Sequence, residues 1–435
     1  MNISLYGWGR TDKFISRISS PKNLKELIKV SKKKELIARG YGRSYGDSSI
    51  QKKFTIITKN LNKIIKFDEK NGIIEAQSGI SIKELLNLTL PKKWILPVIP
   101  GSKFISLGGM VASDIHGKNH HIEGSFRNHI LEIKMINDKG YITCNKKKNR
   151  DLFSYTIGGM GLTGVIYSCK FKLKKVSSNY IFQETIKSSN LKETIKSIYN
   201  SSKWNYNVAW VDTSSSGNSI GRSVLFRGNH IKEKRKDEID VDFLNKSKMR
   251  FFFNFPSWLM NRYLIKFLNS IYFLLQTNSK KNVSLDNFFF QLDKIHSWNL
   301  IYGKNGFVSY QCSFPKNQAY IAIKKILELL LKYKVFSFVS VIKSLGEKSK
   351  FLSFGKKGLT VVFDFPVYKN LNKVLDIIDD VVIQHQGDIY LVKDSRISKN
   401  KFNKTKMGFK SKNFKLLRKK YGNRFCSNQS VRLGL

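Results

Sequence analysis

The spacing of apolar residues predicts short strands in the first part of the chain. Residues 54–58 and 72–76 are rich in branched side chains and lie between turn residues, which is typical of strands. Ser81 precedes an apolar run and Glu84 follows three residues later, so this pair predicts a capping box and a helix over 81–88. We therefore expect small sheets with few helices in this region.

Beyond about residue 176 glycine becomes rarer and helical periodicity predominates. Helices are predicted at 191–200, 262–275, 317–333 and 371–386. Strands are predicted at 306–312 and 335–343, and the second alternates with the period of two of a half-buried strand. Its two sides carry Val335, Ser337, Val339 and Val341, and Phe336, Phe338, Ser340 and Ile342. The pattern as a whole predicts an α+β protein with a boundary near residue 176.

The predicted helix over 262–275 is amphipathic, and two interpretations of it remain open. It is either an ordinary half-buried helix or a basic helix that lies on a membrane. The membrane interpretation draws on the aromatic segment 251–258, which follows Lys248 and Arg250. The expected polar face consists of Arg262, Lys266, Asn269 and Ser270, and the expected apolar face of Leu264, Phe267, Leu268, Ile271 and Leu275.

Composition adds a strong positive charge to this picture. The 435 residues carry a formal charge of +47, and the 41% hydrophobic content is sufficient for a core, which excludes a wholly disordered chain. Lysine outnumbers arginine 63 to 15 and is spread evenly, whereas proteins that read nucleic-acid bases concentrate arginine. The charge therefore indicates an anionic partner such as a phosphate or an acidic lipid surface, and disfavours nucleic acid.

Cysteine usage and hydropathy bear on where the protein works. The four cysteines, at 144, 169, 312 and 426, are too dispersed for a disulfide scaffold or a zinc knuckle, so we expect reduced thiols. The first residues lack the basic and apolar segments of a signal peptide, and no run reaches the ~20 apolar residues that a membrane span requires. We expect a protein that is cytoplasmic or peripheral to the inner membrane.

Three glycine-rich segments are the candidate chemistry of the chain. They are residues 39–47 (Arg-Gly-Tyr-Gly-Arg-Ser-Tyr-Gly-Asp), 97–121 and 157–165. None is a Walker A loop or a G-x-G-x-x-G that opens a helix. Glycine lets a backbone approach a ligand closely, and successive N–H groups can form an anion nest. Together the segments fit an extended cofactor that carries a pyrophosphate.

A family resemblance rests on two of these segments. Residues 39–47 and the string Asp-Ile-His-Gly-Lys-Asn-His-His at 114–121 resemble the FAD-binding domain of the vanillyl-alcohol oxidase and p-cresol methylhydroxylase superfamily. Within it, they are most similar to decaprenylphosphoryl-β-D-ribose 2′-oxidases. Shorter matching tags follow in the same order along the chain, at 7–10, 209–212, 298–302, 310–311 and 393–396.

The resemblance implies a two-domain, PCMH-type FAD-binding fold. Residues 1–176 would bind FAD, 177–387 would form an antiparallel-sheet substrate domain, and 388–435 would return to the FAD-binding domain. The superfamily's covalent histidine lies in a Gly-His-Ser context that reads Gly42-Arg43-Ser44 here, so non-covalent FAD is expected. The implied FAD contacts are Ala38, Arg39, Gly40, Tyr41, Gly42, Arg43, Ser44, Tyr45, Gly46, Asp47, Ser48, Gly101, Ser106, Leu107, Gly108, Gly109, Ser113, Asp114, Ile115, His116, Gly117, Ile166 and Tyr390.

The same resemblance implies oxidation of a secondary alcohol. Flavin accepts the hydride, and the protein supplies position, a base and charge. The implied catalytic residues are Lys393, His116 and Tyr45, and the implied substrate contacts are Lys118, Gln311, Lys343, Lys393 and Trp210. The expected substrate is a polyprenyl-phosphoryl pentose oxidised at its 2′-hydroxyl, with an NAD(P)H-dependent short-chain reductase as pathway partner and a membrane surface close by. A soluble sugar, alditol or aldonolactone is the alternative substrate class.

Departures from the family pattern fall on the substrate side. Phe289 stands where the family has tyrosine, Ser309 where mycobacterial enzymes have glutamine, and Val362 where they have cysteine. Two rival functions are weaker. The residues His116, His120, His121 and Glu123 could bind zinc only on a helix, and Gly117, Asn119 and Gly124 favour a loop. An RNA-binding function would require clustered basic residues that the dispersed lysines do not supply.

Overall fold

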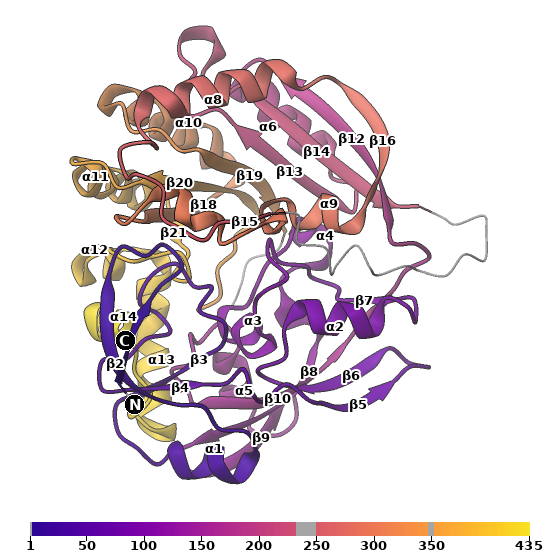
Figure 1. Ribbon diagram of the computed structural model, residues 1–435, viewed down its shortest axis with the longest axis vertical. Coiled ribbons are helices and arrows are strands. Elements are labelled where there is room, and N and C mark those ends of the chain that lie inside the picture. The colour runs from indigo at the N-terminus through magenta and orange to yellow at the C-terminus, as the bar shows by residue number, and fades with distance from the viewer. Residues whose placement is uncertain (1, 232–248, 347–351) are drawn as a thin grey trace.

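The computed structural model describes residues 2–231, 249–346 and 352–435. Residues up to 175 form two main sheets in the lower half of Figure 1, and the segment from 180 to 389 contributes a third, larger sheet above them. The helices that follow residue 398 return to the lower half. The fold is thus the mixture of helices and sheets that the α+β prediction expected.

The first sheet has the strand order β1-β2-β4-β3, in which β2 and β3 run parallel to β4. The second sheet is antiparallel with the order β5-β6-β10-β8-β9, and β7 pairs with β11 beside it. The bounds of these strands are β1 Asn2–Tyr6, β2 Lys13–Ser19, β3 Leu36–Arg39, β4 Phe54–Ile57, β5 Ile64–Asp68, β6 Ile73–Gln77, β7 Trp94–Ile95, β8 Ile130–Asn137, β9 Gly140–Asn145, β10 Val165–Lys172 and β11 Lys174–Lys175.

Short helices connect these strands, and the one predicted from the capping pattern is confirmed. In α2, the Ser81 hydroxyl accepts from the Glu84 N–H at 3.1 Å, and the Glu84 carboxylate accepts from the Ser81 N–H at 2.7 Å. A cap of this kind contributes about 1 kcal/mol. The helix bounds in this region are α1 Leu24–Val30, α2 Ile82–Thr89, α3 Leu107–Ser113, α4 His120–Glu123 and α5 Arg150–Thr156.

The third sheet is antiparallel throughout and has the order β16-β12-β14-β13-β19-β20-β18-β21. The predicted helices at 191–200, 317–333 and 371–386 are α6, α10 and α11, which bury one of its faces in the largest apolar core. The strand bounds are β12 Tyr180–Ser188, β13 Tyr206–Val211, β14 Ser223–His230, β16 Ser279–Ser284, β18 Phe307–Pro315, β19 Val339–Leu345, β20 Gly358–Pro366 and β21 Asp388–Ile389. The three helices span Leu191–Asn200, Lys316–Tyr333 and Leu371–Gln384.

The opposite face of this sheet is only partly covered. Helix α8, predicted over 262–275, spans Arg262–Leu275 and packs Tyr272 and Phe273 against β13, β14 and β19. The remaining short elements near it are β15 Met249–Arg250, α9 Leu285–Phe289 and β17 Ile295–His296. In the described residues no helix is long and apolar enough to cross a membrane.

Two sequence predictions in this part of the chain are wrong in detail. The strand predicted over 335–343 begins only at Val339, because the backbone N–H of Ser337 donates to the Thr213 hydroxyl at 2.9 Å instead of joining a ladder. On α8 the expected faces do not hold: Asn269 is buried and donates to Asp212 and to the Ser337 carbonyl, whereas Phe267, Ile271 and Leu275 are exposed. Lys248 lies outside the described residues.

The C-terminal segment crosses back to the first sheet. β21 pairs with β18, so Asp388 and Ile389 still belong to the large sheet. Helices α12 Lys399–Lys404, α13 Lys406–Tyr421 and α14 Asn428–Leu433 follow, and Phe425 pairs with Leu36 of β3. The domain limits at 176 and 387 stay predictions.

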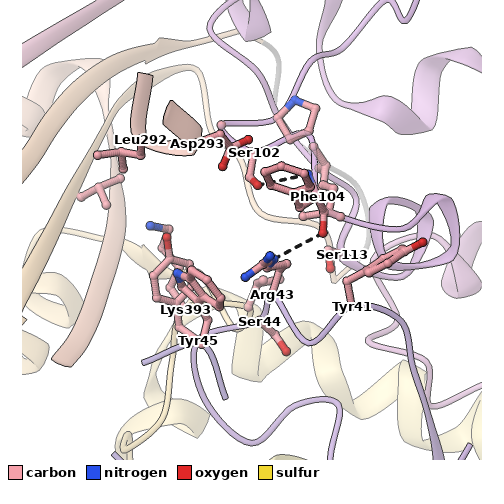
Figure 2. Close-up of a pocket in the computed structure, with 18 of the residues that line it drawn as sticks. Tyr41, Arg43, Ser44, Tyr45, Ser102, Phe104, Ser113, Leu292, Asp293 and Lys393 are labelled. Carbon is pink, nitrogen blue, oxygen red and sulfur yellow. Dashed lines mark hydrogen bonds between the residues drawn. The ribbon is translucent and has the colours of Figure 1, made fainter. Parts of the chain in front are cut away.

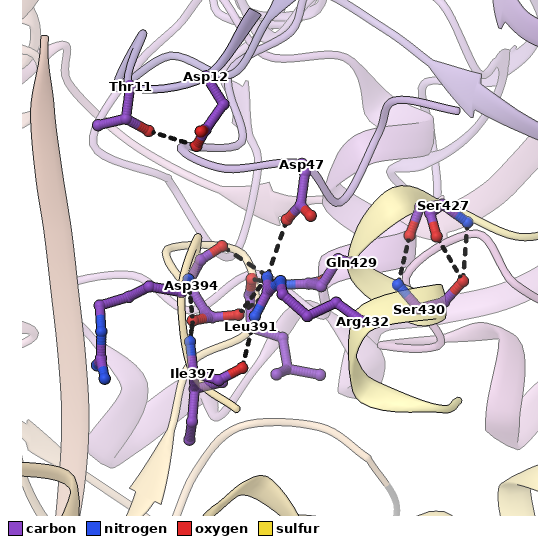
Figure 3. Close-up of polar contacts among 11 residues, drawn as sticks. Thr11, Asp12, Asp47, Leu391, Asp394, Ile397, Ser427, Gln429, Ser430 and Arg432 are labelled. Carbon is purple, nitrogen blue, oxygen red and sulfur yellow. Dashed lines mark hydrogen bonds and ion pairs between the residues drawn. The ribbon is translucent and has the colours of Figure 1, made fainter. Parts of the chain in front are cut away.

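Arg432 joins this C-terminal segment to the first glycine-rich segment (Figure 3). Its guanidinium lies 3.0 Å from an Asp47 carboxylate oxygen and 2.9 Å from one of Asp394. It also donates to the Ile397 carbonyl at 2.7 Å, and Gln429 donates to Asp394 at 3.1 Å. Arg432 therefore holds three segments that are distant in sequence.

Replacing Arg432 should destabilise the whole fold. Arg432→Ala leaves two largely buried carboxylates without their cation, and loss of one partner of such a cluster costs about 3 kcal/mol of unfolding free energy. Denaturant unfolding of the holoprotein measures this loss. Lys324→Ala removes an exposed ion pair with Glu328 on α10 and should cost less than about 0.5 kcal/mol. Equal losses for the two variants would contradict the prediction.

Candidate active site

A cavity of about 540 Å³ lies between the glycine-rich segments and the partly covered face of the large sheet. Its lower wall is formed by the loop that follows β3, by residues 99–118 and by the turn before β10. Its upper wall is formed by β13, β18, β19 and β20 and by the inner side of α8. Figure 2 shows Tyr45 and Lys393 on one side of the cavity and Ser102 and Asp293 across from them, with Arg43 beside Phe104.

Most of the residues predicted to contact FAD or substrate line this one cavity. The substrate and catalytic candidates all do: Tyr45, His116, Lys118, Trp210, Gln311, Lys343 and Lys393. Of the FAD candidates, those that line it are Ala38, Gly40, Tyr41, Gly42, Arg43, Ser44, Tyr45, Ser48, Gly101, Ser106, Gly108, Gly109, Ser113, Ile115, His116, Gly117, Ile166 and Tyr390.

Five predicted FAD contacts lie behind the cavity wall and support it. Arg39 packs beneath Gly42 and donates to the Tyr6 carbonyl at 2.6 Å, while Asp47 pairs with Arg432. Leu107 is fully buried in the core of the second sheet. Asp114 accepts from the Arg127 backbone and side chain, and Gly46 is packed against the Asp394 carbonyl. These five residues shape the wall and do not line the cavity.

The backbone of the lower wall and two of its polar atoms are suited to a bound flavin nucleotide. A Cβ on Gly40 would lie 2.1 Å from the Ser106 hydroxyl, so glycine allows this loop to approach the start of α3. Gly42 has a φ of +64°, which L side chains rarely adopt. The buried Ser78 hydroxyl and His116 Nδ1 line the cavity and have no hydrogen-bond partner in the part of the chain that the structure describes. A bound cofactor can supply partners to both.

Lys393 occupies the centre of the polar wall. Its Nζ donates to the Ser309 hydroxyl at 3.0 Å, lies 3.9 Å from the Asp364 carboxylate, and sits 4.2 Å from the centre of the Tyr45 ring. Burial lowers the pKa of Lys393, and the nearby Asp364 carboxylate opposes this shift. Burial also raises the pKa of Tyr45 well above its usual value, so its phenol stays protonated. Lys393 is therefore a group on this wall that can release or accept a proton.

Lys343 lies on β19, on the same side as Val339 and Val341, and all three line the cavity. Among the described residues its ammonium makes no hydrogen bond or ion pair. Burial lowers its pKa to about 8, and the charge of Lys393 adds to the shift. A buried cation without a partner favours an anionic ligand.

His116 is a neutral imidazole whose tautomer follows from its neighbours. The Thr360 hydroxyl donates to the Cys312 carbonyl at 2.8 Å, so it accepts from the Gln311 amide at 3.0 Å. The same amide nitrogen lies 2.9 Å from His116 Nε2, which must then accept. Burial, with the charges of Lys343 and Lys393, lowers the pKa of His116 well below its usual value. The proton therefore sits on Nδ1, which is free to donate into the cavity.

Lys118, at the end of the lower wall, reaches Phe289, which is one of the departures from the family pattern. Lys118 donates to the Phe288 carbonyl, and its ammonium lies 5.7 Å from the centre of the Phe289 ring. Burial lowers the pKa of Lys118 to about 7, and Lys343 adds to the shift. Phe289 and Val362 line the cavity, whereas Ser309 lies behind Lys393 and positions it.

The sequence analysis missed several polar residues of the cavity. Asp364 is buried in β20 and accepts from the Ser309 hydroxyl at 2.5 Å, and Asp293 accepts from the Lys103 N–H at 2.7 Å. Asp364 carries the only charged side chain in the otherwise apolar strand Gly358–Pro366, and a charge in a buried strand is a signal for a functional group. Helix α3, which begins at Ser106 within the second glycine-rich segment, was also missed.

The zinc interpretation finds no support in the part of the chain that the structure describes. No group of three or more His, Cys, Asp or Glu side chains there is placed to hold a metal ion. His121 instead bonds the Trp204 carbonyl at 2.8 Å, and His120 Nδ1 accepts from the Gly346 N–H at 2.9 Å.

The fold and this cavity define a flavin-dependent oxidoreductase, and comparison with known proteins agrees. Residues 13–145 match the FAD binding domain family, which identifies FAD as the cofactor and the fold as PCMH-type. The chain is 30% identical to decaprenylphosphoryl-β-D-ribose oxidase of Mycolicibacterium smegmatis over 417 residues. The aligned residues are 92% of this chain and 90% of the relative. The protein therefore belongs to the decaprenylphosphoryl-β-D-ribose oxidase family, as the sequence motifs predicted.

More distant relatives match over part of their length. Cytokinin dehydrogenase 3 of Arabidopsis thaliana is 28% identical over 171 residues, which are 36% of this chain and 32% of the relative. D-arabinono-1,4-lactone oxidase of Candida glabrata is 21% identical over 193 residues, which are 43% of this chain and 37% of the relative.

A side chain at Gly40 should weaken flavin binding. Gly40→Ala places a methyl group 2.1 Å from the Ser106 hydroxyl, which separates the first glycine-rich segment from α3. We expect at least about tenfold weaker FAD affinity, a cost of roughly 1.4 kcal/mol, measured by flavin absorbance against protein concentration during titration of the apoprotein. Gly140→Ala, in the β8–β9 turn, strains the backbone at a φ of +94° but does not line the cavity, so it should keep the parent FAD affinity. Unchanged affinity in Gly40→Ala would refute this role of the loop.

Proposed function

We propose that the protein oxidises the 2′-hydroxyl of a polyprenyl-phosphoryl pentose to a ketone with non-covalently bound FAD. The observation that carries the proposal is the ammonium of Lys343, which has no partner among the described residues and lies in the same cavity as Lys393. One lysine is suited to the substrate's phosphate and the other to its reacting hydroxyl. The relative from Mycolicibacterium smegmatis carries decaprenylphosphoryl-β-D-ribose in its name, which supports this substrate class.

Each step at the sugar hydroxyl would have its own residue, namely Lys393, His116 or Tyr45. FAD, when bound, accepts the hydride that leaves the carbinol carbon. In its uncharged form the Lys393 amine takes the hydroxyl proton as the carbon–oxygen double bond forms, and burial lowers the pKa of Lys393 toward that form. The Nδ1–H of His116 is available to orient an oxygen, and the ring of the protonated Tyr45 lies beneath Lys393 Nζ.

Arg43 supports non-covalent attachment of the flavin. It occupies the position of the superfamily's flavin-linked histidine, and its guanidinium lies 3.8 Å from the centre of the Trp8 ring and donates to the Phe104 carbonyl at 3.4 Å. A protonated guanidinium is not a nucleophile at neutral pH. Acid precipitation should therefore leave the flavin in the supernatant.

The keto sugar implies a partner reaction. Reduction of the new ketone from the opposite face would invert the 2′ centre, and an NAD(P)H-dependent short-chain reductase is the class of enzyme that supplies this step. The pair of reactions would then be an epimerisation of a lipid-linked pentose used in the cell envelope.

Anaerobic addition of polyprenyl-phosphoryl ribose tests the substrate class. We expect the oxidised flavin bands of the holoprotein to bleach, because the substrate delivers its hydride to FAD. Lys393→Met should keep its flavin spectrum and bleach about 10²–10⁴ times more slowly, the range for loss of a general base. Bleaching by a soluble pentose or an aldonolactone, with none by the lipid-linked sugar, would establish the alternative substrate class instead.

Substrate binding should depend on pH through Lys343. With a pKa of about 8 this group is charged at pH 7 and largely neutral at pH 9, so the phosphate loses its cation as pH rises. A single titration of this kind raises KM about tenfold between pH 7 and 9. Lys343→Met should show a high KM already at pH 7 and no further rise from this group. A wild-type KM that is constant across this range would contradict the assignment.

A further inference from the structure

An unusually large share of the exposed apolar side chains belongs to one short stretch of the chain. Of the twenty-two exposed large apolar side chains among the described residues, nine lie between Met249 and Leu275. We call them the aromatic patch. Its members are Met249, Phe252, Phe253, Trp258, Tyr263, Phe267, Ile271, Leu274 and Leu275. Phe252 is 80% exposed and Trp258 is 73% exposed, which is rare for side chains of this size.

On α8 the exposed apolar residues share one side of the helix. Tyr263, Phe267 and Leu274 are separated by four and seven residues, a spacing that places them along a single stripe. The other side of the same helix packs into the protein, with Ile265 and Asn269 buried. Leu268, Asn269 and Tyr272 from this inner side line the cavity. The helix therefore separates the cavity from whatever contacts the aromatic patch.

The loop before α8 is held in place by backbone and side-chain bonds. The Phe255 N–H donates to the Leu300 carbonyl at 3.1 Å, and Arg10 donates to the Asn254 side chain at 2.5 Å. Asn261 caps α8 and donates to the Trp258 carbonyl at 3.1 Å. These hydrogen bonds fix the loop while Phe252, Phe253 and Trp258 remain exposed. The fold therefore holds these aromatic side chains on the surface.

The positive charge around the aromatic patch favours an anionic partner. Between Met249 and Leu285 the sequence has no aspartate or glutamate but five basic residues, namely Arg250, Arg262, Lys266, Lys280 and Lys281. Arg262 stacks 4.9 Å from the centre of the Tyr263 ring, which joins a cation to an interfacial aromatic residue. A second copy of this chain would bring the same charge of +47 to the contact and be repelled. Anionic lipid head groups complement both the charge and the apolar side chains.

We propose that the aromatic patch docks the protein on the surface of an anionic lipid bilayer. The apolar side chains insert among the lipids, and the five basic residues contact the head groups. Docking places the outer side of α8 on the bilayer while its inner side lines the cavity. The use of this arrangement rests on the proposed function. Docking in this orientation lets a lipid-linked sugar enter the cavity while its lipid chain stays in the membrane.

Vesicle binding tests the docking surface without any sugar substrate. The holoprotein should co-sediment with phosphatidylcholine vesicles that contain 30% phosphatidylglycerol, and much less with pure phosphatidylcholine. Phe252→Ser combined with Phe253→Ser and Trp258→Ser should lower the vesicle partition coefficient at least tenfold. Arg262→Gln with Lys266→Gln should lower it on anionic vesicles and reduce its sensitivity to salt. The matched control, Phe409→Ser with Leu416→Ser, removes exposed apolar side chains from α13 and should bind like the parent.

Three further measurements separate loss of vesicle binding from other effects of the substitutions. Each variant must retain its flavin spectrum, which shows that loss of vesicle binding is not loss of the fold. Trp258 fluorescence, identified by its absence in Trp258→Phe, should be quenched by lipids brominated near the head of the acyl chain. Equal vesicle binding by the patch variant and the α13 control would overturn the proposal. So would a parent protein that forms dimers in light scattering, if the patch variant loses these dimers and keeps vesicle binding.

Failure of the docking surface and failure of the proposed substrate are distinguishable. Flavin bleaching is measured with detergent-solubilised substrate and without vesicles, so it reports on the cavity alone. Vesicle binding without bleaching by a lipid-linked sugar would leave the membrane surface valid and remove the substrate proposal.

Discussion

The ion cluster of Arg432 with Asp47 and Asp394 is the contact on which the geometry of the cavity depends. Asp47 ends the first glycine-rich segment, and Asp394 follows Lys393 directly. Around it the Tyr45 N–H donates to the Val392 carbonyl at 3.0 Å, and Gly46 is packed against the Asp394 carbonyl. The loop that lines the cofactor side and the lysine that would meet the substrate therefore move as one unit. A C-terminal helix fixes the distance between two walls of the cavity.

A second constraint is electrostatic. Three lysines, Lys118, Lys343 and Lys393, share one cavity, and burial lowers the pKa of each. Within the described residues, Lys393 alone among them has a carboxylate close by, that of Asp364. Three cations in a region of low dielectric repel one another and disfavour their charged forms, and they also bind an anion strongly when one enters. The free energy lost in keeping these cations together would thus be regained on binding an anion.

Local sequence signals predicted much of the fold because they depend on residues close in the chain. The capping box of Ser81 and Glu84 and the apolar periodicity over 191–200 and 262–275 each gave an element at the correct place. The strand predicted from residue 335 begins at Val339, because a distant hydroxyl, that of Thr213, takes the Ser337 N–H. The faces of α8 were assigned wrongly for a related reason: Asn269 finds buried partners that no helical pattern can reveal.

By itself, the sequence determined the family, the cofactor and the glycine-rich segments that approach it, because backbone loops that require glycine leave a motif of fixed spacing. It also predicted which lysines and which histidine belong to the cavity. Only the tertiary structure decided what each of them does. Arg39, Asp47 and Asp114 lie in the same motifs yet support the wall from behind, since a motif does not specify which side chains point inward. Among the described residues, the lack of a partner for Lys343, the Nδ1 proton of His116 and the outward aromatic patch arise from contacts, or missing contacts, between segments far apart in the chain.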